Sequence, residues 1–145
     1  MNEAHYNPPM VQIDITYQGD LRCQAKHLPS GTILQTDAPV DNMGKGESFS
    51  PTDLVATALG TCMLTTMGIV AQRKNIDISG TIVSVTKEMV TAPLRRIGRL
   101  TVTIHVPHEL GEDDRRRLEH AAHSCPVHKS LHDDVEQPVT FKWGK

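Results

Sequence analysis

Two cysteines in this 145-residue sequence, Cys62 and Cys125, have surroundings in which thiol chemistry occurs. Three cysteines are too few and too scattered for a disulfide-stapled secreted scaffold, so a retained pair in a reducing compartment would be catalytic, redox-active or metal-binding. Cys125 directly precedes "PVHKSL", at the expected start of a short helix, with His123 and His128 nearby. These features stabilise a thiolate. From the residues alone, Cys125 is predicted to be the more reactive thiol, with a purely structural helix cap as the alternative.

Cys62 lies in "ALGTCMLTTM", which has the pattern of a buried helix. Free cysteine is among the most buried residue types, so a packing role is the simpler interpretation. Cys62 also lies well past the first helical turn, where the helix dipole has faded. Making it a nucleophile would therefore require a nearby cation. Arg22 and Lys45 are the candidates, and Arg22 is the better one because its charge survives burial.

A metal site at Cys125, His128 and His132 is an alternative, because their Cys-x2-His-x3-His spacing is one that zinc can use. No second Cys-x2-Cys pair accompanies them, so the leading interpretation includes no metal and no cofactor. A Ser-His-Asp hydrolase is disfavoured because no Gly-x-Ser-x-Gly turn is present. The segment "GKGES" is too short for a phosphate-binding loop.

The elements that must position these residues follow from hydrophobic periodicity. Ser50, Pro51 and Asp53 form a strong helix start, with an N-cap, a proline at the first position and an acid in the first turn. A loop is expected at 40–48. The predicted strands are 11–19, 21–27, 32–39, 76–90, 99–107 and 137–143, and the predicted helices are 50–74, 111–125 and 126–134. This order predicts an α+β fold with mainly antiparallel pairing.

The long helix is expected to bury one apolar face. A three-stranded N-terminal meander is too thin to cover it alone, which predicts dimerisation. Strand 11–19 is expected to be half-buried, because apolar and polar residues alternate along it. The helix positions predicted on the core face are Val55, Leu59, Cys62, Thr66 and Ile69.

The composition limits the possible functions. The length predicts a single domain over 1–145. A net charge of −2 gives no basis for binding nucleic acid or an anionic membrane. No stretch is expected to approach the roughly 20 apolar residues of a membrane span, and the N-terminus lacks the pattern of a signal peptide. A soluble, cytoplasmic protein is predicted, whose partner is a small molecule or another copy of itself.

Taken together, "SPTDLVATALGTCM" and, far downstream, "SCPVHKSL" resemble the OsmC/Ohr family of osmotically inducible and organic hydroperoxide resistance proteins. The resemblance implies mainly antiparallel sheets packed on a long central helix, in an intertwined homodimer with active sites at the subunit interface. It also implies a peroxidase in which Cys62 attacks the hydroperoxide, Cys125 resolves the product as a disulfide, and an external dithiol regenerates the enzyme. Arg22 matches the family's activating arginine.

One position departs from the typical peroxidase branches. Thr52 stands where those branches carry a Glu that positions the arginine. Asp53 is expected to point to another side of the helix, whereas Glu47 can take over the role if its loop folds in. The resemblance is therefore to the OsmC-like branch rather than to typical Ohr proteins. A small-ligand binding or sensing protein with weak or no peroxidase activity is the alternative function.

Overall fold

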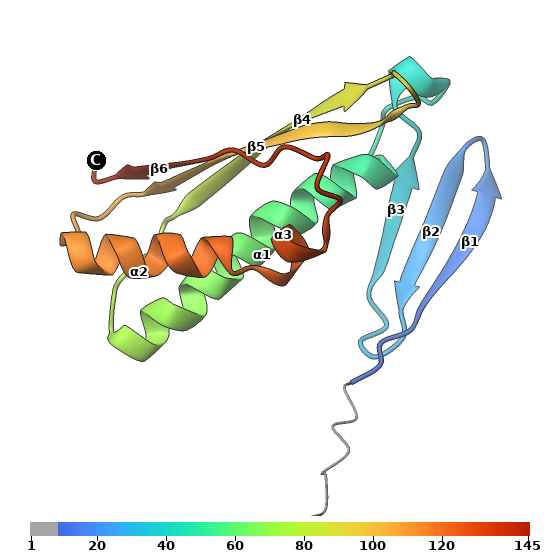
Figure 1. The fold of residues 1–145 in the computed structure, drawn as a ribbon. Helices are drawn as coiled ribbons and strands as arrows, with labels where there is room; N and C mark the ends of the chain where they lie inside the picture. Colours follow the sequence, from blue (N-terminus) through green and yellow to red (C-terminus); the bar gives the residue numbers. More distant parts are fainter. Residues whose placement is uncertain (1–8) are drawn as a thin grey trace, which may run out of the picture. The chain divides into compact units, whose positions relative to one another are not determined.

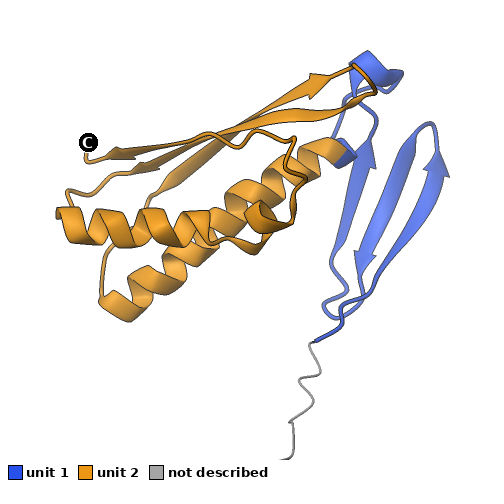
Figure 2. Cartoon of the chain, viewed as in Figure 1, with its two compact units in different colours: residues 1–51 blue, residues 52–145 orange. Residues whose placement is uncertain are grey.

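The computed structural model describes residues 9–145, which belong to two compact units. Unit 1 ends at Pro51, and unit 2 spans Thr52–Lys145 (Figure 2). The proposal that 1–145 forms one functional domain stays a prediction.

Unit 1 is an antiparallel sheet of three strands in the order β1-β2-β3, with bounds Ile13–Gly19, Arg22–His27 and Ile33–Asp37 (Figure 1). Tyr17 of β1 pairs with Cys23 of β2, and Cys23 pairs with Thr36 of β3. Asp20 and Leu21 form the turn between β1 and β2. The expected loop at 40–48 contains one short 3-10 helix, Val40–Asn42.

The apolar side chains of β1 lie on the surface, so the prediction that this strand is half-buried is wrong. Ile13, Ile15 and Tyr17 are 54%, 68% and 63% exposed. The physical reason is that a single sheet layer without a helix or second sheet of its own cannot bury a face. Among residues 9–145, every fully buried hydrophobic side chain belongs to unit 2.

Unit 2 contains a second three-stranded sheet with helices on one of its faces (Figure 1). Strands β4 (Ile82–Val90) and β5 (Arg96–Val106) are antiparallel, as predicted, whereas β6 (Val139–Trp143) runs parallel to β5. The helices are α1 (Pro51–Lys74), α2 (Glu112–His123) and α3 (Pro126–Ser130). The α+β fold with mainly antiparallel pairing is confirmed.

The core of unit 2 lies between β5 and the helices. Alternate residues of β5 are fully buried, as the period-2 pattern predicts. One stripe of α2 is buried as well. The buried residues are Leu100, Val102, Ile104 and Val106 on β5, Leu118, Ala121 and Ala122 on α2, and Cys125 just beyond it.

The buried face of α1 is rotated from the predicted one. Ile69 is 44% exposed, and Val55, Cys62 and Thr66 are only partly buried. Leu59 is fully buried, as predicted. The other core positions carry Ala, Gly and Met, which have no β-branch and allow α1 to approach β4 closely. The buried positions are Ala56, Leu59, Gly60, Met63, Met67 and Ala71.

A row of threonines marks an exposed side of α1. Thr57, Thr61 and Thr65 each bond their hydroxyl to the carbonyl four residues earlier. By length and composition α1 is apolar enough to cross a membrane, so the expectation that no stretch reaches this level is wrong. The core helix of a soluble protein meets the same criteria, and α1 contributes six buried residues to the core of unit 2.

Two glycines of α1 make a matched pair for testing this close approach. A Cβ on Gly60 would lie 2.9 Å from Val85 Cγ2, whereas a Cβ on Gly68 would meet nothing within 4 Å among the described residues. We expect Gly68→Ala to raise the free energy of unfolding by about 0.5–1 kcal/mol through helix propensity. Gly60→Ala should lower it by about 1 kcal/mol, because overpacking exceeds that gain. Urea unfolding measures both, and equal effects would contradict the predicted packing.

Candidate redox site

The thiols of Cys62 and Cys125 lie close enough together for Cys62 to raise the pKa of Cys125, so the structure brings the two predicted thiols together. Cys62 lies on α1 and is partly buried. Cys125 lies between α2 and α3 and is fully buried. Both thiols are free, as is Cys23 on β2. Two thiols that interact directly have the proximity that a disulfide requires.

Cys125 is the N-cap of α3, as predicted, and its Sγ accepts the backbone N–H of His128 at 3.3 Å. Burial is the main cause that raises its pKa, and the hydrogen bond with Cys62 raises it further. The N–H groups of His128 and Val127 only partly offset this effect. Burial therefore outweighs the cap and disfavours the Cys125 thiolate, which argues against the prediction that Cys125 is the more reactive thiol.

A second cluster, within unit 1, surrounds Arg22. Its guanidinium forms an ion pair and hydrogen bond with Glu47, and it lies 3.6 Å from Asp37. The backbone N–H of Glu47 donates to Asp37 Oδ2 at 3.0 Å. The loop before α1 therefore folds back onto Arg22. Glu47 raises the pKa of Arg22 above its ordinary value through this hydrogen bond and its charge.

Asp37 is the residue of this cluster that no sequence pattern predicted. It is only 1% exposed, at the end of β3. A strand-end aspartate before Ala-Pro carries no signal that distinguishes it from an ordinary turn residue. Lys45, the other candidate cation, is exposed. Its backbone N–H, like that of Glu47, lowers the pKa of Asp37.

The ionisation of Asp37 predicts how the loop responds to acid. The Glu47 N–H is the main cause that lowers the pKa of Asp37, and Arg22 adds to it. A lowered folded-state pKa gives stability that is present above the unfolded value, near 4, and lost as the pH falls through the folded value. We expect the Glu47 amide NMR signal to titrate below pH 4. Asp37→Asn should abolish this transition, and a signal that titrates unchanged in that variant would contradict the assignment.

Position 52 has its own partner within unit 2. Lys87 Nζ donates to Thr52 Oγ1 at 2.7 Å and pairs with Asp53 Oδ1 at 2.8 Å. Thr52 and Asp53 therefore bind one ammonium group, although they are neighbours on the helix. Lys87 was not predicted as part of this site. The available signal was its place on the same face of β4 as Val83 and Val85, where a charge needs a partner.

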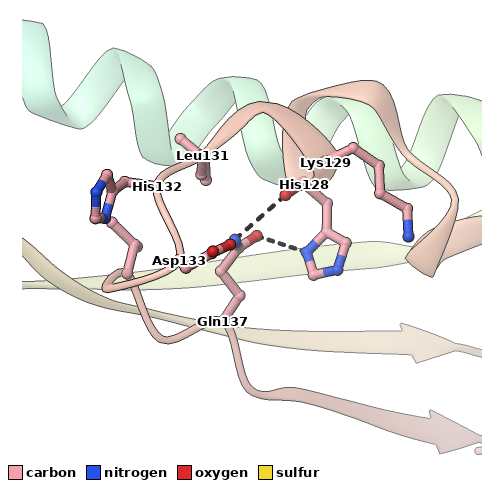
Figure 3. Close-up of a pocket in the computed structure, with 7 residues that line it drawn as sticks. His128, Lys129, Leu131, His132, Asp133 and Gln137 are labelled. Atoms are coloured by element: carbon pink, nitrogen blue, oxygen red, sulfur yellow. Dashed lines mark hydrogen bonds between the residues drawn. The ribbon is translucent and has the colours of Figure 1, made fainter.

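The three residues of the alternative metal site, Cys125, His128 and His132, do not form a set of metal ligands. Within residues 9–145, no group of three or more His, Cys, Asp or Glu side chains is arranged to hold a metal ion. Instead, His128 Nδ1 bonds to Gln137 Oε1 at 2.6 Å, and His132 Nδ1 accepts the N–H of Asp134. His128, His132 and Gln137 line an open, mostly polar pocket beside α3 (Figure 3).

Comparison with known proteins places these features in a family. The model of the OsmC family, described as OsmC-like protein, matches residues 44–139. A solved structure from Psychrobacter arcticus 273-4, provisionally assigned to osmotic stress induction and the detoxification response, is 48% identical, with a TM-score of 0.86 over 94% of this chain and 98% of that one. No curated protein matches.

More distant structures share the fold. An organic hydroperoxide resistance protein of Legionella pneumophila is 15% identical, with a TM-score of 0.75 over 92% of this chain and 97% of that one. A Vibrio cholerae protein, provisionally assigned to organic hydroperoxide resistance and with captopril bound in one of its active sites, is 16% identical. Its TM-score is 0.73 over 97% of this chain and 96% of that one.

Proposed function

Because this chain belongs to the OsmC-like protein family, we propose that it is a thiol-dependent peroxidase that reduces organic hydroperoxides and hydrogen peroxide. Family membership supports the broader role in peroxide defence. The observation that carries the specific chemistry is the contact between Cys62 and Cys125. Two thiols in contact, one of them buried and protonated, suit a two-step reaction in which one attacks and the other resolves.

The proposed reaction proceeds through Cys62. Its thiolate attacks the terminal oxygen of the hydroperoxide, the O–O bond breaks, and the alkoxide takes a proton and leaves as an alcohol. Cys62 is now a sulfenic acid. The Cys125 sulfur attacks it, an S–S bond forms, and the hydroxyl leaves as water with the Cys125 proton. An external dithiol then reduces the disulfide and is itself oxidised.

Arg22 and Glu47 have supporting roles in this proposal. The guanidinium of Arg22 stabilises the Cys62 thiolate and the negative charge on the leaving oxygen. Glu47 orients that guanidinium, the role that a glutamate at position 52 has in typical peroxidase branches. The support for this assignment is the ion pair between Arg22 and Glu47 together with the engagement of Thr52 by Lys87.

We also propose that the working form is a cytoplasmic homodimer. OsmC-family proteins are generally dimeric, and a soluble protein is compatible with a single apolar helix that lies in the core. Unit 1 has no buried hydrophobic side chain among its described residues, while β1 exposes Ile13, Ile15 and Tyr17. A second copy that covers this face would supply the burial that one chain lacks.

The test is to add cumene hydroperoxide to fully reduced protein and count free thiols. Two thiols per chain should be lost, and peptide mapping should find Cys62 linked to Cys125. Loss of no thiol, or of Cys23 alone, would contradict the peroxidase proposal.

A small-ligand binding or sensing protein is the second candidate, and the observation that favours it is Thr52 bound to Lys87 in place of a glutamate beside the arginine. Thermal stabilisation by an apolar ligand that persists in Cys62→Ser, in a protein whose thiols resist peroxide, would favour this function.

A further inference from the structure

We propose that Gln137 is a positioning residue for Cys125 and sets the rate at which Cys125 forms the disulfide with Cys62. The inference rests on the proposed function, in which Cys125 is the resolving thiol. It follows from a chain of hydrogen bonds that runs from strand β5 through Gln137 and His128 to the Cys125 sulfur.

Gln137 holds His128 at two points. Its Oε1 accepts a hydrogen bond from His128 Nδ1 at 2.6 Å, and its Nε2 donates to the His128 carbonyl at 3.4 Å (Figure 3). Both bonds require the same orientation of the amide, so the proton of a neutral His128 ring lies on Nδ1. Gln137 therefore fixes the side chain and the backbone of His128 together.

Gln137 is itself anchored to the sheet. The N–H groups of Leu100 and Val102 on β5 donate to the carbonyls of Glu136 and Pro138, at 2.8 and 2.9 Å. Both donors belong to residues that are fully buried in the core of unit 2. The backbone on either side of Gln137 is thus tied to the strand whose alternate side chains lie in the core of the unit.

The other end of the chain of hydrogen bonds is the thiol. The His128 N–H donates to Cys125 Sγ, and the Lys129 N–H donates to the Cys125 carbonyl at 3.2 Å. The His123 ring packs edge-on against the His128 ring, with centroids 6.0 Å apart. A shift of His128 would therefore turn its N–H away from the sulfur.

This N–H matters because of what Cys125 must do. Burial raises the pKa of its thiol, so few molecules carry a thiolate at neutral pH. In the resolving step the sulfur gains negative character as its proton moves to the departing hydroxyl. A donor aimed at the sulfur stabilises that charge, and without Gln137 the donor is no longer held in place.

The experiment compares Gln137→Leu with wild type in two closure reactions. In the first, cumene hydroperoxide forms the Cys62 sulfenic acid. In the second, diamide, an azo oxidant, adds to one thiol and is displaced as the hydrazine by the other, so closure occurs without any peroxidase activity. We expect closure to be about ten-fold slower in both, the effect of losing one buried hydrogen bond. The pH midpoint of the closure rate should also rise, which mere loosening would not cause.

Matched variants separate positioning from general damage. Glu136→Gln, at the neighbouring position, removes the negative charge that pairs with Arg99 and should leave closure unchanged. Gln137→Glu keeps an acceptor for Nδ1–H and should recover most of the rate. If Gln137→Leu does not fold, Gln137→Ser, too short to reach His128, replaces it.

The outcomes distinguish this inference from the proposed function. A wild type that closes with diamide but does not react with the hydroperoxide refutes the peroxidase, and the Gln137 effect on diamide closure then still supports the positioning role of Gln137. Closure of Gln137→Leu at the wild-type rate and pH midpoint overturns that role. A wild type that forms no disulfide with either oxidant overturns both.

Discussion

Cys62→Ser protein is expected to reduce cumene hydroperoxide at least about a thousand-fold more slowly than wild type, because loss of a nucleophile removes the covalent route. Cys125→Ser should instead reduce one equivalent and stop, because the sulfenic acid on Cys62 then has no adjacent thiol with which to form a disulfide. Stopped-flow consumption of hydroperoxide measures both, and dimedone labelling identifies the sulfenic acid.

Cys23 provides the control for this experiment. It is a free cysteine on β2, in the other unit, and Cys23→Ser should retain wild-type turnover. Turnover that survives in Cys62→Ser and disappears in Cys125→Ser would reverse the assignment of the two thiols. Such a result would also conflict with the raised pKa of the buried Cys125 thiol.

Arg22→Met is expected to slow the reaction of Cys62 with hydroperoxide by roughly a hundred-fold, the usual effect of removing a donor that stabilises developing charge. Arg22→Lys should recover little, because an ammonium group cannot reproduce the planar fork that contacts two carboxylates. Glu47→Gln should have a smaller effect, since the guanidinium keeps its charge and its neighbour Asp37. Single-turnover kinetics at limiting peroxide measure the first step in isolation.

Lys26→Met is the matched control for these variants. Lys26 is an exposed cation on the same strand as Arg22, so its loss changes net charge equally. An equal slowing in Lys26→Met and Arg22→Met would point to general electrostatics. A wild-type rate in Arg22→Met would show that another group activates Cys62.

The sequence predicted local elements well and their buried faces less well. On α1 the spacing of apolar residues does not distinguish the predicted core face from the observed one, because Ala, Gly, Met and Val occur on several sides of the helix. Which face of α1 is buried depends on where β4 lies, and β4 places Val83 and Val85 against Gly60. The alternation in β1 indicated an apolar face correctly, yet no other element of unit 1 covers that face.

Side-chain partners were the hardest features to predict. The cap position of Cys125 followed from the Cys-Pro sequence, but its raised pKa depends on burial and on Cys62, which is distant in sequence. Asp37 contacts Glu47, and Lys87 contacts Asp53, only after folding brings these residues together. The sequence alone therefore does not identify either contact. Glu47 was named as a partner for Arg22 from a resemblance, and the two do form an ion pair.

The absence of buried apolar side chains from unit 1, among its described residues, has a consequence for regulation by abundance. The thiol pair belongs to unit 2, which has a hydrophobic core within a single chain. Arg22 belongs to the unit that, in the proposed dimer, depends on a second copy for its cover. The monomer–dimer equilibrium then controls the activation of Cys62 by Arg22, but it does not control the pairing of Cys62 with Cys125. Specific activity per chain would fall on dilution, and a rise in cellular level would increase peroxide reduction more steeply than in proportion.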